Sequence, residues 1–512
     1  MTAKCVMVLG TTSGAGKSWL ATALCRYYAR QGLKVAPFKA QNMSNNARVV
    51  ASENGQGEIG SAQYFQALAA NAVPDVRMNP LLLKPERDTH SQVVLMGQVD
   101  AELSAMPWRG RSLKVWPQIA AALDALRAEY DVVVIEGAGS PAEINLSASD
   151  IVNMRVALHA QAACLLVTDI DRGGAFAHLY GTWALLPEEE RVLIKGYVLN
   201  KFRGDSSLLA PAPQMLQELT GVPTVATLPM WWHHGLPEED GVFDDRSVAA
   251  GVVTQTVAVI AYPRISNLDE FQPLKNIPGV RLQWVRSPSE LAALSASDWI
   301  ILPGSKYTAG DLAWLRSQGL DAAIASHAGR GGAVLGVCGG LQMLGEALID
   351  PHGIDGNAPG LGLLPLVTVF DLDKTVRHTR TEFDVGIAHT GRLPDTDWVH
   401  GEVDVSTPWA ALAGVQVAGY EIHHGQTAQH PAMAKAGDVA RAVLPDGLGW
   451  QNAAGNVLGL YLHGLFEDPR ALQALFGAHR NGPVPTLDSV FERMADFVAQ
   501  HFDAGVLDAL RQ

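Results

Sequence analysis

At 512 residues the chain is long enough for two or three globular domains, and its 48% hydrophobic and 18% charged residues are ordinary for packed α/β cores. A net charge of −14, with no cluster of lysines and arginines, excludes general nucleic-acid binding and favours small-molecule partners. Four cysteines without a CxxC pair, an N-terminus without a signal-peptide pattern and no apolar run near the ~20 residues of a membrane span predict a cytoplasmic protein without disulfides, structural zinc or membrane contact.

The first half of the chain alternates short apolar runs with helical patterns. Apolar runs that end in a polar or glycine residue are typical of buried parallel strands, and we expect strands at 6–9, 132–135, 164–168 and 196–199, with helices at 19–30 and 116–130. This alternation implies right-handed crossovers in a doubly wound sheet, whose ligands gather at the carboxyl ends of the strands. The sequence therefore predicts an α/β domain over residues 1–232.

A glycine-rich segment, Gly10-Thr-Thr-Ser-Gly-Ala-Gly-Lys-Ser18, stands between the first expected strand and the first expected helix. Its glycines, including Gly14 and Gly16, allow backbone N–H groups to turn toward an anion, Lys17 reaches terminal phosphates, and the Ser18 hydroxyl is a magnesium ligand. The bland alternative is a glycine-rich turn with a surface lysine. Because the segment lies between a strand and a helix, we expect a nucleotide site that binds ATP.

Polar residues follow the other strands of this predicted sheet. Glu136 and Asp169 would supply the hard oxygen ligands that Mg²⁺ prefers, whereas Lys39 and Asn200 would contact the nucleotide. The alternatives are a helix cap or solvated turn for each acidic residue and a solvated surface group for the lysine. Asp171 stays open, either as a second metal ligand or as a partner of the arginine that follows it.

Residues 233–252 are rich in glycine, proline and acidic residues and lack a sustained apolar period, which predicts an interdomain linker. A second strand series follows at 257–261, 299–302, 333–337 and 457–461, and it predicts a second α/β domain over 253–512. The last helical pattern is amphipathic. Its apolar face carries Phe491, Met494, Phe497, Val498 and Phe502.

The run Ala333-Val-Leu-Gly-Val-Cys-Gly-Gly-Leu-Gln342 indicates a strand, a tight turn and a helix start, with Cys338 at the turn. Glycines two residues before and after the cysteine match the spacing of a nucleophile elbow, in which the helix N-terminus favours the thiolate. The N–H groups of Gly339 and Gly304 would form an oxyanion hole. The alternative is a buried structural cysteine, which rarely lies between glycines.

A cysteine nucleophile needs a base from a distant part of the sequence. His463 follows the expected strand 457–461, so we predict that it faces Cys338. The pair His423–His424 also follows an apolar run and is a candidate contact to the acceptor or to the other domain. The pair His233–His234 falls in the predicted linker and is expected to be solvated.

Five segments together resemble the cobyric acid synthase family over nearly the whole chain. They are Gly10–Ser18, Phe38-Lys-Ala-Gln-Asn-Met-Ser-Asn-Asn46, Asp169-Ile-Asp-Arg-Gly-Gly174, Gly336-Val-Cys-Gly-Gly340 and Tyr461-Leu-His-Gly464. The N-terminal half is similar to dethiobiotin synthetase, which also has threonine at the first P-loop position, here Thr11. The C-terminal half resembles class I glutamine amidotransferases.

The resemblance implies amidation of the b, d, e and g carboxylates of adenosylcobyrinic acid a,c-diamide with glutamine, ATP and Mg²⁺. Its motifs assign Lys17, Ser18 and Glu136 to nucleotide and metal, and Cys338 and His463 to the glutaminase. Class I enzymes usually carry glutamate two places after the histidine, where this chain has leucine. We therefore expect a Cys–His dyad, with the nearby Glu467 in a structural role.

Three alternatives remain. The nearest is an a,c-diamide synthase, or another enzyme with a fused glutaminase that acts on a different acid, and only substrate tests separate these from amidation of the b, d, e and g carboxylates. A nucleotide-switch protein of the partitioning ATPase type shares the deviant P-loop but does not require the Cys338 turn. A glutaminase half that only binds partners is the third. Homo-oligomerisation is left open.

Overall fold

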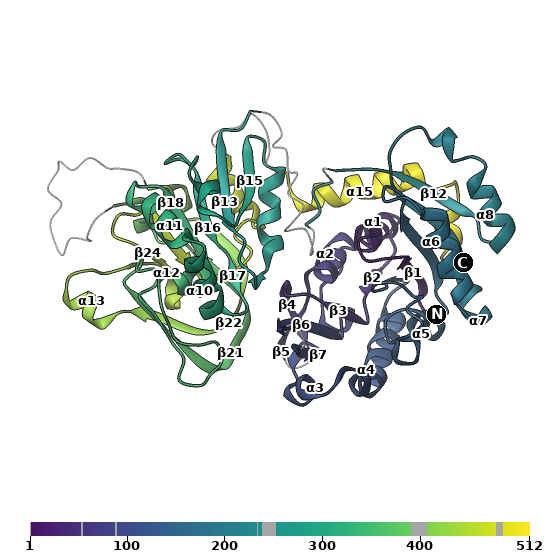
Figure 1. The fold of residues 1–512 in the computed structure, drawn as a ribbon, viewed down its shortest axis with the longest axis horizontal. Coiled ribbons are helices and arrows are strands. Elements are labelled where there is room, and N and C mark those ends of the chain that lie inside the picture. Colours follow the sequence, from purple (N-terminus) through teal and green to yellow (C-terminus); the bar gives the residue numbers. More distant parts are fainter. Residues whose placement is uncertain are drawn as a thin grey trace. The chain divides into compact units, whose positions relative to one another are not determined.

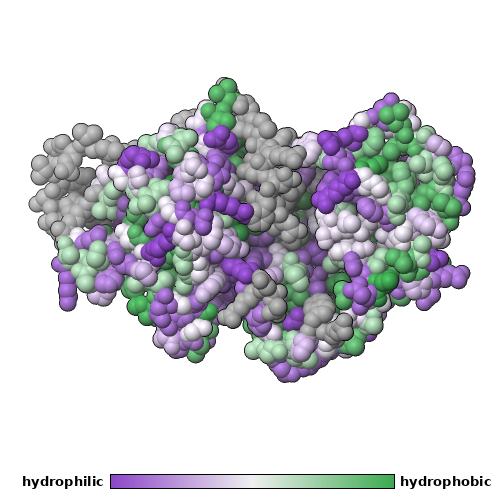
Figure 2. Space-filling model, in the orientation of Figure 1, coloured by the Kyte–Doolittle hydropathy of each residue, from purple (hydrophilic) through white to green (hydrophobic). Residues whose placement is uncertain are grey.

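The computed structural model describes residues 2–52, 55–87, 90–232, 234–237, 252–390, 407–477 and 485–512 (Figure 1). The chain forms two compact units. Unit 1 comprises Met1–Ser44, Val50–Leu236 and Leu487–Gln512, and unit 2 comprises Asn45–Val49 and Pro237–Thr486. Among the described residues, no helix combines the length and the apolar composition needed to cross a bilayer. On the face shown in Figure 2, hydrophilic residues are interspersed with hydrophobic ones.

Unit 1 is built on a six-stranded parallel sheet of order β12-β11-β10-β1-β9-β2, as the strand–helix alternation predicts. The strands are β1 (Lys4–Gly10), β2 (Val35–Phe38), β9 (Val132–Glu136), β10 (Ala163–Asp169), β11 (Ile194–Phe202) and β12 (Thr224–Pro229). Its main helices are α1 (Lys17–Ala29), α2 (Ser61–Ala69), α4 (Trp108–Glu129), α5 (Met154–Ala160), α6 (Ala175–Leu185) and α8 (Ala212–Thr220). The apolar side chains of these strands are buried, so the polar residues at their ends are held on a rigid support.

Smaller strands lie between β2 and α4. One sheet has the order β3-β6-β7-β8, and β4 pairs with β5 in a second. The strands are β3 (Gln41–Met43), β4 (Ala47–Ser52), β5 (Gly55–Gly60), β6 (Leu81–Arg87), β7 (His90–Leu95) and β8 (Gln98–Val99), followed by α3 (Ala101–Ala105). These short strands were not predicted from the sequence, because none has a long apolar or alternating run.

The C-terminal helix α15 (Leu487–His501) belongs to unit 1, where it packs along α1 (Figure 1). Its apolar face is buried in the same core as α1. The Arg26 guanidinium pairs with Asp488 at 2.7 Å and Glu492 at 2.9 Å, and Phe502 forms a β-bridge with Ala226. The expected boundary that assigned all of 253–512 to the second domain is therefore corrected at residue 487. Most of the expected linker, 238–251, lies outside the described residues.

Unit 2 contains a seven-stranded sheet of order β15-β13-β16-β18-β25-β24-β23, in which the first five strands are parallel. The strands are β13 (Gln255–Ile260), β15 (Val280–Val285), β16 (Trp299–Leu302), β18 (Ala333–Val337), β23 (Arg441–Leu444), β24 (Gly449–Gln451) and β25 (Val457–Leu460). Its helices include α10 (Thr308–Ser317), α11 (Leu320–Gly329), α12 (Gly339–Leu344), α14 (Pro469–Phe476) and the 3₁₀ helix η4 (Leu268–Asn276). The predicted strand series of the second domain is confirmed.

A long antiparallel pair, β21 (Leu366–Glu382) and β22 (Gln416–Gln429), continues into a four-stranded sheet with β19 (Ala347–Ile349) and β20 (Ala358–Pro359). The short strands β14 (Ile265–Ser266) and β17 (Gly304–Ser305) pair beside the main sheet. The backbone of both β17 and β22 reaches the predicted nucleophile turn. A Cβ at Gly339 would lie 2.8 Å from the Ser305 nitrogen of β17, and the Cys338 sulfur lies 3.5 Å from the Ile422 carbonyl of β22.

Candidate active sites

The glycine-rich loop connects the end of β1 to the start of α1, as predicted. Gly14 and Gly16 have φ angles of 72° and 101°, which few side-chain-bearing residues adopt. Asn200 closes over the loop, because its Nδ2 donates to the Ala15 carbonyl at 2.9 Å and would lie 2.1 Å from a Cβ at Gly16. Lys201 adds a second bond to the Gly14 carbonyl at 2.9 Å. These contacts and positive φ angles fix the loop in the conformation that a phosphate-binding turn requires.

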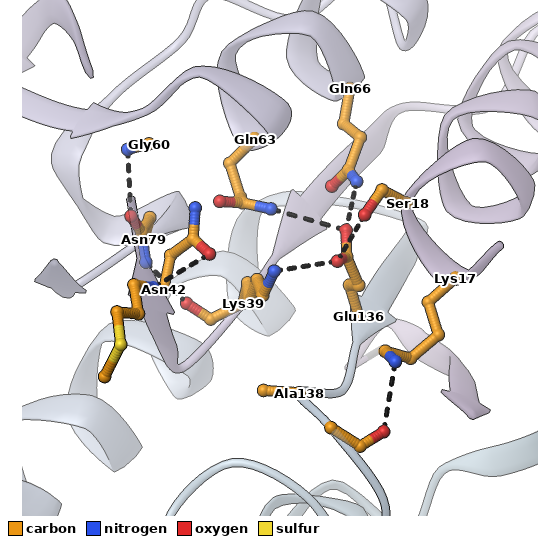
Figure 3. Close-up of polar contacts among 12 residues, drawn as sticks. Lys17, Ser18, Lys39, Asn42, Gly60, Gln63, Gln66, Asn79, Glu136 and Ala138 are labelled. Carbon is orange, nitrogen blue, oxygen red and sulfur yellow. Dashed lines mark hydrogen bonds and ion pairs between the residues drawn. The ribbon is translucent and has the colours of Figure 1, made fainter. Parts of the chain in front are cut away.

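Glu136 at the end of β9 is the centre of a buried polar cluster beside this loop (Figure 3). Its carboxylate accepts hydrogen bonds from the Ser18 hydroxyl at 2.8 Å and the Gln66 amide at 2.5 Å, and pairs with the Lys39 amine at 2.8 Å. Burial raises the pKa of Glu136, but Lys39 and the two donors outweigh it and hold the pKa below its ordinary value. Glu136 is therefore an ionised carboxylate in contact with Ser18.

The Lys17 amine donates to the backbone carbonyls of Thr12 and Gly139, both at 3.0 Å. Figure 3 shows it on a different side of the cluster from Lys39. Lys17 begins α1 and contacts the backbone that follows Glu136, whereas Lys39 follows β2 and pairs with the Glu136 carboxylate itself. This arrangement places two cations where phosphate charge would need neutralising.

Asp169 is held apart from this cluster. It ends β10, on the opposite side of β1 from β9, and pairs with Lys201 at 3.1 Å and Arg172 at 3.4 Å. Asp171 pairs with Arg203 instead of with its neighbour Arg172. Within the described residues, no group of three or more His, Cys, Asp or Glu side chains is placed to hold a metal ion. Of the three predicted metal ligands, the structure therefore brings together Ser18 and Glu136. Asp169 instead pairs with Lys201, which also bonds to the loop.

In unit 2, Cys338 sits at the turn between β18 and α12 with φ 52° and ψ −107°, a strained conformation for a residue with a side chain. The flanking glycines make the turn sterically feasible. A Cβ at Gly336 would lie 2.6 Å from the Gly340 carbonyl carbon, and a Cβ at Gly340 would lie 1.8 Å from the Leu302 carbonyl oxygen. The expected nucleophile elbow is present in the backbone.

Replacing Gly340 by alanine is expected to destabilise the chain by about 3 kcal/mol or more, because the new methyl group meets rigid backbone of β16. The measurement is the urea midpoint by circular dichroism, beside Gly329→Ala as a control. Gly329 ends α11, and a Cβ there would meet no heavy atom within 4 Å. The control should stay within about 1 kcal/mol of the natural chain. Equal midpoints for both variants would contradict the steric account of the elbow.

The two predicted oxyanion glycines lie beside the elbow. A Cβ at Gly339 would be 2.8 Å from the Ser305 backbone nitrogen, so β17 passes directly over the start of α12. A Cβ at Gly304 would be 3.2 Å from Cε1 of His463. The structure thus gathers Gly304, Gly339 and His463 around Cys338, at one end of the parallel strands β16, β18 and β25.

The His463 imidazole is fully buried and has a carboxylate partner that the sequence did not indicate. Its Nδ1 lies 2.8 Å from Oε1 of Glu270, and the other oxygen of Glu270 accepts the Gly464 N–H at 2.9 Å. Burial lowers the pKa of His463, but the charges of Glu270 and Cys338 outweigh it and raise the pKa to about 10. With Nδ1 engaged, Nε2 is the nitrogen left for proton transfer.

The expected Cys–His dyad is therefore extended by Glu270, which lies in η4, far upstream of the histidine. The sequence pointed only to the residues just after His463, because class I enzymes usually carry their glutamate there. Glu467 is partly buried near the site, and it pairs with Arg48 at 2.5 Å. The segment around Glu270 offers no motif or spacing that would have marked it.

The rival histidines have other roles. The His423 ring is buried, stacks on Tyr461 at 3.9 Å between centroids, and lies 2.9 Å from the Gly425 carbonyl and 3.2 Å from the Glu421 carboxylate. Its neighbour His424 lies 3.2 Å from the Asp371 carbonyl. In the former linker region, His233 lies outside the described residues, whereas His234 packs edge-on against Trp19 and Trp231 and is not simply solvated.

Comparison with known proteins agrees with this division into sites. A family described as "CobQ/CobB/MinD/ParA nucleotide binding domain" matches residues 6–236, and a "CobB/CobQ-like glutamine amidotransferase domain" matches residues 256–471. Curated relatives named cobyric acid synthase are 79% identical in Albidiferax ferrireducens, over 100% of both chains, and 77% identical in Polaromonas naphthalenivorans, again over 100% of both. The chain belongs to the cobyric acid synthase family. A further relative, from Leptothrix cholodnii, is 62% identical over 99% of this chain and 97% of its own.

Membership of the cobyric acid synthase family, with its glutamine amidotransferase domain, makes the chain a glutamine-dependent amidotransferase. The nucleotide-binding match contains the loop with Lys17 and the Glu136 cluster, and the amidotransferase match contains Glu270, Cys338 and His463. The α/β fold of both halves and the recognition of the family from sequence motifs are confirmed.

Proposed function

We propose that the chain converts adenosylcobyrinic acid a,c-diamide to adenosylcobyric acid by amidating its b, d, e and g carboxylates with glutamine and ATP, a step of cobalamin biosynthesis. The observation that carries this assignment is the pairing, in one chain of the cobyric acid synthase family, of a phosphate loop with an ionised Glu136 and a strained Cys338 beside a His463–Glu270 pair. The first site activates a carboxylate, and the second releases ammonia.

In the glutaminase half, the Cys338 thiolate attacks the side-chain amide carbon of glutamine. The N–H groups of Gly339 and Gly304 stabilise the tetrahedral oxyanion, for which their placement beside the elbow is suited. His463, charged through its pairing with Glu270, donates its Nε2 proton to the departing ammonia. Water then hydrolyses the thioester and restores the thiolate.

In the nucleotide half, the loop N–H groups and Lys17 bind the ATP phosphates, and the γ-phosphate passes to a corrinoid carboxylate. The acyl phosphate that forms has a leaving group that ammonia can displace.

Ser18 and Glu136 fit a magnesium ion, because they present two hard oxygen donors at 2.8 Å from each other beside the loop. When bound, Mg²⁺ would neutralise phosphate charge. We assign Lys39 to the nucleotide site as well, and Asp169 to the support of the loop through Lys201.

Changing Glu136 to glutamine is expected to reduce ATP-dependent amidation by at least about 100-fold with either glutamine or ammonia. The Ser18 hydroxyl and the Lys39 amine would both lose the charged carboxylate that they contact. Basal glutamine hydrolysis should stay within about twofold of the natural chain, since Cys338 and its partners lie in unit 2. Amide formation is followed by mass spectrometry and glutamate by coupled assay. Glu218→Gln, an exposed carboxylate on α8, is the matched control. Unchanged amidation in Glu136→Gln would reject the metal and nucleotide role.

The substrate assignment is tested by offering two acceptors with Mg-ATP and glutamine. With adenosylcobyrinic acid a,c-diamide, we expect a series of four amidated products. With cobyrinic acid, which still has its a and c carboxylates, an a,c-diamide synthase would stop at the diamide. Rapid diamide formation from cobyrinic acid with no change in the diamide acceptor would favour that rival, and glutamine hydrolysis without any corrinoid product would point to a different acid.

A further inference from the structure

A short segment from the N-terminal part of the sequence is built into unit 2. Residues Asn45–Val49, here called the inserted segment, belong to unit 2, although the chain on both sides of them belongs to unit 1. The segment lies outside the amidotransferase family match at 256–471. It overlaps the end of the Phe38–Asn46 motif, to which the reaction scheme so far gives only Lys39 a role.

Two residues of the inserted segment fix the start of η4, the helix that carries Glu270. The Asn46 Oδ1 accepts the Leu268 N–H at 3.0 Å, and the Ala47 carbonyl accepts Nδ2 of Asn267 at 3.0 Å. Asn267 has a φ of 54° and also donates to the Tyr420 hydroxyl at 2.7 Å. The conformation of the backbone that leads into Glu270 therefore depends on the inserted segment.

Arg48 makes the charged contacts of the segment that are nearest to Glu270. Its guanidinium is fully buried, donates to Asp269 and Glu467 at 2.5 Å each, and lies 5.1 Å from the centroid of the Tyr420 ring. The same Tyr420 ring stacks on His463 with 5.1 Å between centroids and 14° between planes. Arg48 thus touches both the acidic residue that precedes Glu270 and the aromatic ring that covers the imidazole.

Charge balance explains why an arginine is needed at this point. Asp269, Glu270 and Glu467 are all buried or nearly so, and burial with the neighbouring carboxylates raises the pKa of Glu467 to about 7 even beside Arg48. The charged and titratable groups around the Glu270 carboxylate are His463, Tyr420, Tyr262, Arg48, Asp269 and Glu467. Loss of the guanidinium would remove a buried positive charge from beside Asp269 and Glu467, next to the pair formed by Glu270 and His463.

We propose that the inserted segment is a working part of the glutaminase, in which Arg48 is a positioning residue that holds Asp269 and Glu467 and thereby keeps the Glu270 carboxylate directed at His463. This inference rests on the proposed function of Cys338 and His463. It means that the glutaminase of this chain is completed by residues from the half of the sequence that contains the nucleotide loop, so an amidotransferase unit begun near residue 256 would lack its charge balance.

The test compares Arg48→Met and Arg48→Lys in the full chain. For Arg48→Met we expect kcat for glutamine hydrolysis to fall by about 100-fold with a smaller change in KM, and ammonia-dependent amidation to stay within about twofold. The acid limb of the kcat/KM profile should move up by about one pH unit, because carboxylates without a countercharge take up protons at higher pH. Arg48→Lys, which keeps the charge, should restore most of the rate and return the limb toward its natural position.

Arg26→Met is the matched control, because Arg26 is also a buried arginine paired with two carboxylates, but in unit 1. It should leave the acid limb in place. The inference is overturned if Arg48→Met keeps the natural kcat and acid limb, or if Arg48→Met and Arg48→Lys lose activity equally with an unmoved limb, as in a purely structural role. Cys338→Ala runs in parallel. Glutamine hydrolysis that survives in Cys338→Ala would reject the proposed function itself. If Cys338→Ala loses hydrolysis while Arg48→Met keeps the rate of the natural chain, this inference alone is rejected.

Discussion

Replacing Cys338 by alanine is expected to lower glutamine-dependent amidation by at least about 1,000-fold, while amidation supported by ammonium chloride continues at a rate near that of the natural chain. The change removes the thiol at the elbow and leaves Lys17, Ser18 and Glu136 of the nucleotide site, which belong to unit 1, unchanged. Because a methyl group fits where the thiol sits, the variant should fold normally. The measurement is corrinoid amide formation by mass spectrometry with each nitrogen source.

Cys164→Ala is the matched control for this experiment. Cys164 is a buried cysteine in β10, and burial raises the pKa of its thiol to about 12, so it is inert at neutral pH. The control should keep both activities. Loss of ammonia-dependent amidation in Cys338→Ala, or glutamine-dependent amidation that persists in it, would contradict the assignment of Cys338 as the nucleophile.

Replacing Glu270 by glutamine should lower kcat for glutamine hydrolysis by about 100-fold to 1,000-fold. The amide keeps the shape of the side chain but removes the negative charge that orients His463 and keeps it protonated. The Glu270 and Cys338 charges hold the pKa of His463 at about 10. Without Glu270, that pKa falls toward the ordinary ~6.5 of histidine. The alkaline limb of the kcat profile should therefore move to lower pH, since above its pKa the imidazole has no proton to give to ammonia.

The same substitution has a consequence for stability with a defined sign. A histidine whose pKa is raised on folding contributes stability that is fully present below its unfolded pKa and is lost as pH rises through the folded value near 10. Glu270→Gln lacks this contribution. The difference in free energy of unfolding between the natural chain and Glu270→Gln should therefore shrink as pH rises from 7 to 10. Glu270→Asp should rescue part of the rate, and Glu290→Gln, a helix-capping carboxylate of the same unit, should change neither limb. An unmoved alkaline limb in Glu270→Gln would refute the orienting role.

The motifs that were predictable from the sequence are those whose geometry is local. The phosphate loop and the Cys338 elbow each depend on glycines within a few residues of the functional side chain, so spacing alone identifies them. The strand ends at Glu136 and His463 were also predictable, because buried parallel strands end in a recognisable way. These local rules gave the fold class and most of the candidate site.

The remaining features depend on contacts between distant parts of the chain. Glu270 reaches His463 only because the pairing of β14 with β17 and the fold of η4 bring it there, and no sequence period marks that approach. Similarly, Asp169 and Glu136 are both acidic residues at the end of a strand, so the sequence does not distinguish them. In the structure β1 lies between their strands, and the Asp169 carboxylate pairs with Lys201. For α15, the sequence predicted the buried apolar face correctly but assigned the helix to the second domain. An amphipathic pattern shows which face of a helix is buried and not which part of the chain covers it.

The central claim, that this chain transfers the amide nitrogen of glutamine to corrinoid carboxylates at the expense of ATP, is tested most directly with glutamine labelled with ¹⁵N at the amide. The natural chain is incubated with labelled glutamine, Mg-ATP and adenosylcobyrinic acid a,c-diamide, and the corrinoid is analysed by mass spectrometry beside glutamate and ADP. We predict one labelled nitrogen, one glutamate and one ADP for each new amide. Glutamate release with unlabelled or unchanged corrinoid would contradict the account.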